Sequence, residues 1–204
     1  MVAWIQGLAL VSPELSVWYI PRGSPSTANQ NPFQATPDRI LAEAKARPAL
    51  PRNEDAFIFN LWNGKDDAFA AGVGVRDRVK LPGDVEAVGS ADLEFPRNAT
   101  LKQVISAITA TVEALEPEIA GVASTANWSL LDQGRAAGPV MYFSDARFQV
   151  GPLPVGIQEV PTRAPGRILR LDGWTPQSPH QAESPDFSSI DAIVRLRPRS
   201  SRPA

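Results

Sequence analysis

The side chains that most often carry out chemistry in soluble enzymes are scarce in this chain. It contains no cysteine, and its one histidine is His180. A cysteine nucleophile and a thiolate metal site are therefore excluded. A Ser-His-Asp triad would depend on His180, which follows Pro179 in a segment rich in proline and serine. We expect a structural hydrogen-bonding role for that histidine. The sequence therefore predicts no catalytic residue and favours a protein that acts by presenting a surface.

Carboxylates are the remaining candidates for chemistry. Asp66 and Asp67 are adjacent, but neighbouring side chains point apart in extended backbone and no third ligand follows at a useful spacing. We therefore predict no metal site and no cofactor. Gly72-Val73-Gly74 lacks the third glycine and the following helix of a dinucleotide-binding turn. A carboxylate-based hydrolase would need two carboxyl groups at a set separation, which the sequence gives no means of pairing.

Charge is unevenly distributed along the 204 residues. Residues 1–53 and 133–204 are net basic, whereas residues 54–132 hold 6 basic and 13 acidic side chains, a net charge of −7. Because phosphate contacts need Lys and Arg, this acidic middle argues against binding of nucleic acid and suits a basic protein partner. The alternative that these carboxylates are only solvated surface stays equally open.

Alternating apolar residues predict the strands that must position these side chains. Strands are expected at 57–62, 69–75 and 87–95, and Asn63-Gly64 supplies the positive φ angles of a tight reversal between the first two. Five further strands are predicted, at residues 15–20, 118–126, 140–143, 155–160 and 167–171. The apolar run 1–11 is too short to span a bilayer and has no cationic flank. We interpret it as a strand or a docked arm.

Helical periodicity is strongest over residues 99–116, with Asn98 or Thr100 as the N-cap and Pro117 as the stop. A shorter helix is predicted from Pro37 to Arg47 with Thr36 as its cap. Ser184 and Pro185 are expected to open a last helix that extends through Val194. The sum predicts an α+β fold, a largely antiparallel sheet packed by two or three helices.

These elements predict a single α+β domain over residues 1–196. Within it, residues 1–53 form a loop-rich N-terminal part and residues 54–196 the core, and residues 197–204 form a flexible tail. We expect a cytoplasmic protein that does not associate with membranes.

Several short motifs follow one another in order between residues 55 and 195. They are Leu61-Trp62-Asn63-Gly64, the amphipathic helix, Val140-Met141-Tyr142, Asp172-Gly173-Trp174 and Pro179-His180. Their order resembles an α+β family of bacterial immunity proteins, the one numbered fifty-two among the immunity proteins of polymorphic toxins. The resemblance implies a partner encoded beside the chain, a secreted toxin with a restriction-endonuclease-like nuclease domain, delivered in some members by type VI secretion. It implies no catalytic residue, and it favours a role in the fold for Trp62, Tyr142 and His180.

The acidic segment is where we expect the partner to bind. Trp62 flanks the turn beside carboxylates, and aromatic residues in such settings are favoured interface anchors. The predicted partner-binding residues are Trp62, Asp66, Asp67, Asp84, Glu86 and Asp92. A second reading is an adaptor or chaperone that loads a secreted effector. Such a protein would bind a non-toxic region of the effector and leave its activity intact.

Overall fold

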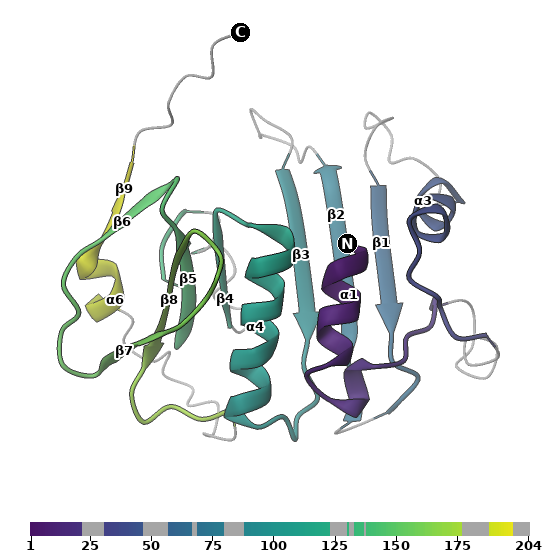
Figure 1. The fold of residues 1–204 in the computed structure, drawn as a ribbon, viewed down its shortest axis with the longest axis horizontal. Coiled ribbons are helices and arrows are strands. Elements are labelled where there is room, and N and C mark those ends of the chain that lie inside the picture. The colour runs from purple at the N-terminus through teal and green to yellow at the C-terminus, as the bar shows by residue number, and fades with distance from the viewer. Residues whose placement is uncertain are drawn as a thin grey trace, which may run out of the picture. The chain divides into compact units, whose positions relative to one another are not determined.

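The structure is a computed structural model that describes residues 1–21, 31–46, 57–66, 69–79, 88–122, 130, 133–136, 138–176 and 188–197. The chain divides into two compact units, residues 2–99 and residues 100–204 together with Met1 (Figure 1). Both units contain helices and antiparallel sheet, which confirms the predicted α+β class. The single domain over residues 1–196 stays a prediction.

The first unit is built on a three-stranded antiparallel sheet. Its strands are β1 (Phe57–Trp62), β2 (Gly72–Val79) and β3 (Val88–Glu94), in the order β1-β2-β3. Phe59 lies opposite Val75 and Leu61 opposite Val73, and all four side chains are buried. One face of the sheet therefore belongs to the core. The predicted second strand began too early, because Phe69 lies before β2 and is 52% exposed.

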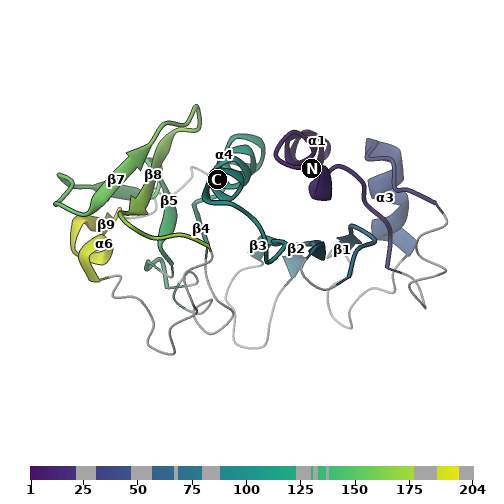
Figure 2. The same cartoon turned by 90° about the horizontal axis from the view of Figure 1, so that it is seen from below.

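The N-terminal residues form a helix, so the expectation of a strand or docked arm at 1–11 was wrong. Helix α1 (Val2–Ala9) buries Trp4, Ile5 and Leu8, which lie on one side of a helical turn. The run is apolar almost throughout, and such a run does not distinguish a helix from a strand by its period. Figure 2 shows α1 on one side of the β1-β2-β3 sheet, where it covers the buried face.

The segment that joins α1 to the sheet also departs from expectation. In place of a strand over 15–20 there is a short 3-10 helix, η1 (Pro13–Leu15), followed by one bridge between Tyr19 and Trp62. Tyr19 N–H donates to the Trp62 carbonyl at 2.7 Å, and Trp62 N–H donates to the Tyr19 carbonyl at 2.9 Å. A proline at each end of the segment leaves little room for a longer ladder.

Helix α3 (Pro37–Ala46) confirms the helix predicted from Pro37. The Oγ1 of Thr36 accepts a hydrogen bond from the N–H of Arg39 at 3.3 Å, as expected of its cap.

The second unit has a four-stranded antiparallel sheet in the order β4-β5-β8-β7. These strands are β4 (Ile119–Val122), β5 (Val140–Ser144), β8 (Gly166–Leu171) and β7 (Ile157–Val160), which confirms four predicted strands. A separate ladder joins β6 (Phe148–Val150) to β9 (Val194–Leu196), and neither strand was predicted. The last helix, α6 (Ser188–Ile193), ends before β9, so its predicted extension through Val194 was wrong. Its predicted opening at Ser184 and Pro185 and the tail from residue 198 lie outside the described residues.

Helix α4 (Leu101–Leu115) confirms the predicted amphipathic helix. Its N-cap is Thr100, whose Oγ1 accepts from Gln103 N–H at 3.3 Å, while Gln103 Oε1 accepts from Thr100 N–H at 2.8 Å. This reciprocal pair satisfies two backbone donors at the helix start. The helix ends at Glu116, which is left-handed with φ 46°, directly before Pro117. No helix among the described residues is long and apolar enough to cross a membrane.

Strand β5 is buried on both faces. Val140 and Tyr142 pack with Ile108 and Val112 of α4, whereas Met141 and Phe143 belong to a second cluster with Ile190 of α6. A strand covered on both sides needs an unbroken apolar sequence. That requirement accounts for the run from Val140 to Phe143, which shows no alternation.

Candidate partner-binding surface

The structure describes three of the six residues predicted to bind the partner. Trp62 closes β1, Asp66 lies in the loop after it, and Asp92 lies on β3. The other three, Asp67, Asp84 and Glu86, lie outside the described residues.

Trp62 and Asp92 share the face of the sheet that points away from the core. Side chains alternate along each strand, so this face carries the residues between the buried ones. Register places Asn60, Gly74 and Asp92 in one row across the three strands. The next row holds Trp62, Gly72 and Glu94. Within residues 2–99, no described helix crosses this face (Figure 2).

Two glycines of β2, Gly72 and Gly74, have no side chain on this face. The carboxylates of Asp92 and Glu94 on β3 can therefore lie over β2. A Cβ atom added to Gly74 would lie 2.8 Å from the Cγ of Asp92, so that carboxylate already occupies the space. A Cβ added to Gly72 would lie 3.6 Å from Oε2 of Glu94. Both carboxylates therefore lean from β3 toward β1. Because β1 and β3 are two strand spacings apart, about 10 Å, Trp62 and Glu94 border the same shallow strip of sheet.

The side chain of Trp62 is half-buried and held in place. Its indole Nε1–H donates to the carbonyl of Lys65 at 2.9 Å, while its backbone is fixed by the two bonds to Tyr19. Asp66 follows Lys65 and is exposed. Its backbone carbonyl accepts a hydrogen bond from Phe69 N–H at 3.3 Å. The structure thus brings an ordered aromatic ring and an exposed carboxylate to the same end of β1.

The loop between β1 and β2 is longer than the tight reversal that the sequence predicted. It runs from Asn63 to Ala71, and only Gly64 of the Asn63-Gly64 pair has a positive φ, 74°. Asn63 is instead buried, with 3% exposure, and its side chain forms hydrogen bonds that hold the loop together. Its Nδ2 donates to the carbonyls of Glu14 and Phe69, and its Oδ1 accepts from the N–H groups of Lys65 and Ala71.

Sequence reasoning missed Glu94 on this surface. Its alternation with Asp92 was a readable signal, because residues two apart on a strand share a face. What the sequence did not contain was the register that sets Glu94 in the row of Trp62.

Tyr142, which lies outside this surface, has a structural role. Tyr142 is fully buried, and its hydroxyl donates to the carbonyl of Pro165 at 3.2 Å. Burial raises the pKa of that hydroxyl above its ordinary value of 10.0, and the nearby carboxylates of Asp145 and Glu116 add to the shift. Tyr142 therefore serves the fold, as expected, whereas His180 lies outside the described residues. Among the described residues, no group of three or more His, Cys, Asp or Glu side chains could hold a metal ion.

Most of the chain matches one known protein family. Residues 1–175 match the model of a protein family described as immunity protein 52. The match begins at residue 1, so it includes the N-terminal part that the short motifs did not cover, and it ends before Pro179-His180. No curated protein matches the chain.

Proposed function

The chain belongs to the immunity protein 52 family, and from that premise we propose that it binds one cognate secreted toxin and blocks its activity. The family match over residues 1–175 is the observation that carries the proposal. An immunity protein works by forming a complex, which agrees with a chain that has no cysteine and one histidine. In this reading it performs no catalysis and needs no cofactor.

We further propose that the toxin is a nuclease, delivered by type VI secretion or a similar route. A nuclease must present a basic surface to its substrate. The acidic segment 54–132, with its net charge of −7, would be attracted to such a surface before contact is made. Fast capture matters for an inhibitor, since free toxin causes damage until it is bound.

The outward face of the β1-β2-β3 sheet is the proposed centre of the contact. Trp62 offers a partly exposed ring that is already ordered by its bond to Lys65. Asp92 and Glu94 lean over the glycines toward it. An arginine of the toxin laid along this strip would contact the indole ring and pair with a carboxylate, a combination that suits its flat guanidinium.

Neighbouring residues must contribute as well. A stable interface needs about 800 Å² from each partner, more than a strip of this kind supplies. Asp66 extends the surface at the end of β1, and Asp67, Asp84 and Glu86 remain proposed contacts from the sequence.

Reconstitution with the toxin encoded beside the chain tests the proposal. We expect the purified proteins to form a complex and nuclease activity to fall to background at a one-to-one ratio. Co-expression should also rescue growth of cells that produce the toxin. A complex in which the nuclease stays fully active would indicate the adaptor instead, and the absence of any complex would contradict both readings. An immunity protein from an unrelated toxin pair serves as the negative control.

A further inference from the structure

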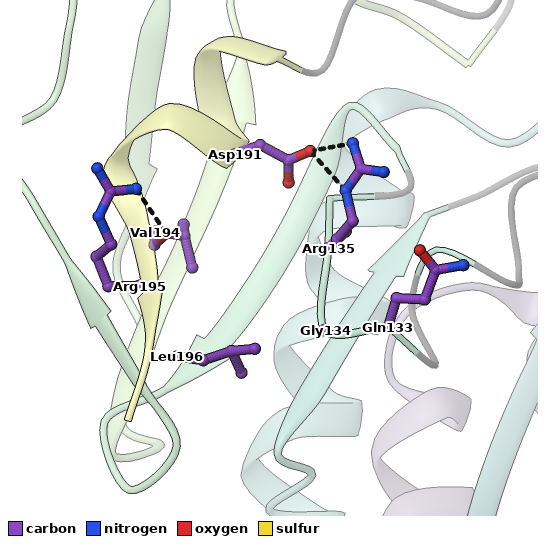
Figure 3. Close-up of a pocket in the computed structure, with 7 residues that line it drawn as sticks. All are labelled: Gln133, Gly134, Arg135, Asp191, Val194, Arg195 and Leu196. Atoms are coloured by element: carbon purple, nitrogen blue, oxygen red, sulfur yellow. Dashed lines mark hydrogen bonds and ion pairs between the residues drawn. The ribbon is translucent and has the colours of Figure 1, made fainter. Parts of the chain in front are cut away.

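A hollow of about 280 Å³ lies in the second unit, beside β9 (Figure 3). Its walls come from two places in the sequence. The turn at 133–135 contributes Gly134 and Arg135, and the segment from α6 into β9 contributes Asp191, Val194, Arg195 and Leu196. None of these residues is among the six that the sequence predicted to bind the partner.

Arg135 is held in a fixed orientation at this hollow. Its Nε and Nη2 groups donate to Oδ2 of Asp191 at 3.3 and 3.0 Å, and Oδ1 of Asp191 accepts from Ala136 N–H at 2.7 Å. Both carboxylate oxygens are thus engaged. The Arg135 side chain is nevertheless 55% exposed, and its Nη1 donates to no acceptor within the described part of the chain. A guanidinium held on one side and open on the other is suited to a second carboxylate.

The backbone of β9 also presents hydrogen-bonding groups along its outer edge. Arg197 N–H donates to the Arg147 carbonyl, and Gly151 N–H donates to the Ile193 carbonyl. In an antiparallel ladder every second pair of opposite residues is hydrogen-bonded. The N–H and C=O groups of Arg195 therefore face Gln149 of β6. The N–H and C=O groups of Val194 and Leu196 therefore point away from β6. The Val194 carbonyl accepts a hydrogen bond from Arg195 Nη1 at 3.4 Å (Figure 3), so the N–H groups of both residues and the carbonyl of Leu196 are the groups offered to a new strand. In the described residues, β6 is the one strand that pairs with β9.

An apolar wall completes the hollow. Leu196 is 52% exposed, and a Cβ atom added to Gly134 would lie 3.2 Å from its Cδ2. Gly134 has a φ of 69°, which a glycine adopts without strain. The turn therefore packs closely against Leu196 while leaving much of that side chain accessible.

Charge identifies the class of ligand. Arg135 presents its guanidinium to the hollow, whereas the carboxylate of Asp191 is already engaged. Arg195 extends to the other side of β9, where its Nη1 donates to the Val194 carbonyl (Figure 3). The surroundings therefore favour an anion. Pairing of β9 with a second copy of itself across a two-fold axis at Arg195 would set two arginines directly opposite each other, which is unfavourable.

We propose that this hollow binds an extended segment of the toxin that carries a carboxylate. The segment pairs with the outer edge of β9, sets an apolar side chain against Leu196 and directs its carboxylate to Arg135. Addition of a strand to a free edge is a common mode of peptide recognition. The inference rests on the proposed function for the identity of the partner, but the site is distinct in charge from the acidic sheet face.

A model peptide tests the site without the toxin. The probe is a capped five-residue peptide with valine at position 2, glutamate at position 4 and threonine elsewhere, so that valine and glutamate share one face of the added strand. It is added to the ¹⁵N-labelled full chain, and the matched peptide has glutamine in place of glutamate. We expect saturable shifts of the Leu196 amide and the Arg135 Nε–H, with binding at least about fivefold weaker for the glutamine peptide. Equal binding of both peptides, or no shift at these groups up to about 5 mM peptide, would overturn the proposal.

Variants distinguish the two recognition elements. Arg135→Gln should weaken binding of the glutamate peptide about tenfold and leave the glutamine peptide unaffected. Leu196→Pro removes an outward N–H without breaking the ladder to β6, so it should weaken both peptides. Arg163→Gln changes the net charge by the same amount on an exposed residue outside the hollow and should have no effect. Unchanged binding in a folded Arg135→Gln chain contradicts the role of the arginine.

The toxin itself separates the two proposals. A wild-type chain that does not bind the toxin contradicts the proposed function. If the wild type binds, and Arg135→Gln and Leu196→Pro bind equally well, the proposed function stands and the role of the hollow is wrong.

Discussion

Asn63 and Ala71 are joined by two hydrogen bonds that close the loop between β1 and β2. The N–H of Asn63 donates to the carbonyl of Ala71 at 3.1 Å, and the N–H of Ala71 donates to Oδ1 of Asn63 at 3.0 Å. The side-chain nitrogen of Asn63 donates to the carbonyls of Phe69, at 2.8 Å, and Glu14, at 3.1 Å. One buried amide thus ties the loop to the sheet and to the segment that follows α1.

Replacement of Asn63 should destabilise the protein more than replacement of an ordinary turn residue. Asn63→Ala leaves the Ala71 N–H without its acceptor and two carbonyls without their donor, so we expect a loss of about 2–3 kcal/mol in the free energy of unfolding. Asn63→Gly should cost at least as much, although a two-residue reversal would accept glycine readily. Urea denaturation measures both. Lys65→Ala, at an exposed side chain, is the control, and a fully stable Asn63→Gly chain would contradict the interpretation.

Glu159 and Arg167 predict a pH-dependent contribution to stability. A hydrogen bond from the Arg167 guanidinium lowers the pKa of Glu159 below its ordinary value of 4.5, against a smaller opposing effect of burial. A lowered pKa in the folded state means that the stabilisation is complete above pH 4.5 and is lost as the pH falls through the lowered value. The coupling between Glu159→Gln and Arg167→Gln in a double-mutant cycle should therefore be measurable at neutral pH and vanish in acid. A coupling that is unchanged at low pH would exclude this ion pair as the cause.

Tyr142→Phe separates a role in the fold from a role in binding. The variant loses the hydrogen bond to the Pro165 carbonyl, so its free energy of unfolding should be about 1 kcal/mol lower than that of the wild type. Since the ring is fully buried, the dissociation constant for the toxin should change less than about twofold. Titration calorimetry at a temperature where both chains are folded provides the comparison. A much larger loss of affinity would show that Tyr142 has a role in binding.

Elements with a clear local period were predictable, and those defined by their surroundings were not. The apolar positions of α4 recur at helical spacing and its cap residues are adjacent in sequence, so the sequence alone predicts the helix. In α1 the residues between the buried ones are also largely apolar, which removes the contrast on which a period depends. Strand β9 continues directly from α6, and its pairing with β6 joins segments far apart in the sequence.

The candidate surface shows the same division. Alternation along β1 was enough to place Trp62 on the other face of the sheet from Phe59 and Leu61. The position of Glu94 in the row of Trp62 depends on two registers, and no local pattern encodes them. The role of Asn63 was hidden for a related reason, because its partner Glu14 is 49 residues away. A turn motif predicts the positive φ of Gly64. It does not predict that the Asn63 side chain is buried and bonded to two segments, because that depends on the tertiary fold.

Trp62 should govern how long the complex lasts. Trp62→Ala removes the ring and the bond to the Lys65 carbonyl, and we expect dissociation from the toxin to become at least about tenfold faster with little change in association. Trp62→Phe keeps an aromatic ring but has no N–H to donate. If the aromatic ring is the anchor, the Trp62→Phe complex should retain most of the wild-type lifetime. If the bond that orders the loop matters more, the Trp62→Phe complex should dissociate as fast as the Trp62→Ala complex. Surface plasmon resonance distinguishes these, and wild-type dissociation in both variants would exclude Trp62 from the interface.

Asp66 and Asp67 should govern how fast the complex forms. Changing both to lysine raises the net charge from −2 to +2 and places repulsion where a basic toxin would approach. We expect association at low salt to slow by about tenfold and to depend less on salt, with dissociation changed much less, because steering acts before contact. Asp38→Lys with Asp145→Lys makes the same change in net charge on exposed residues outside the proposed surface. If both pairs slow association equally, overall charge rather than this surface steers the toxin. If neither pair does, the acidic segment is not where the toxin arrives, and the arginine-rich edge at β9 becomes the first place to look.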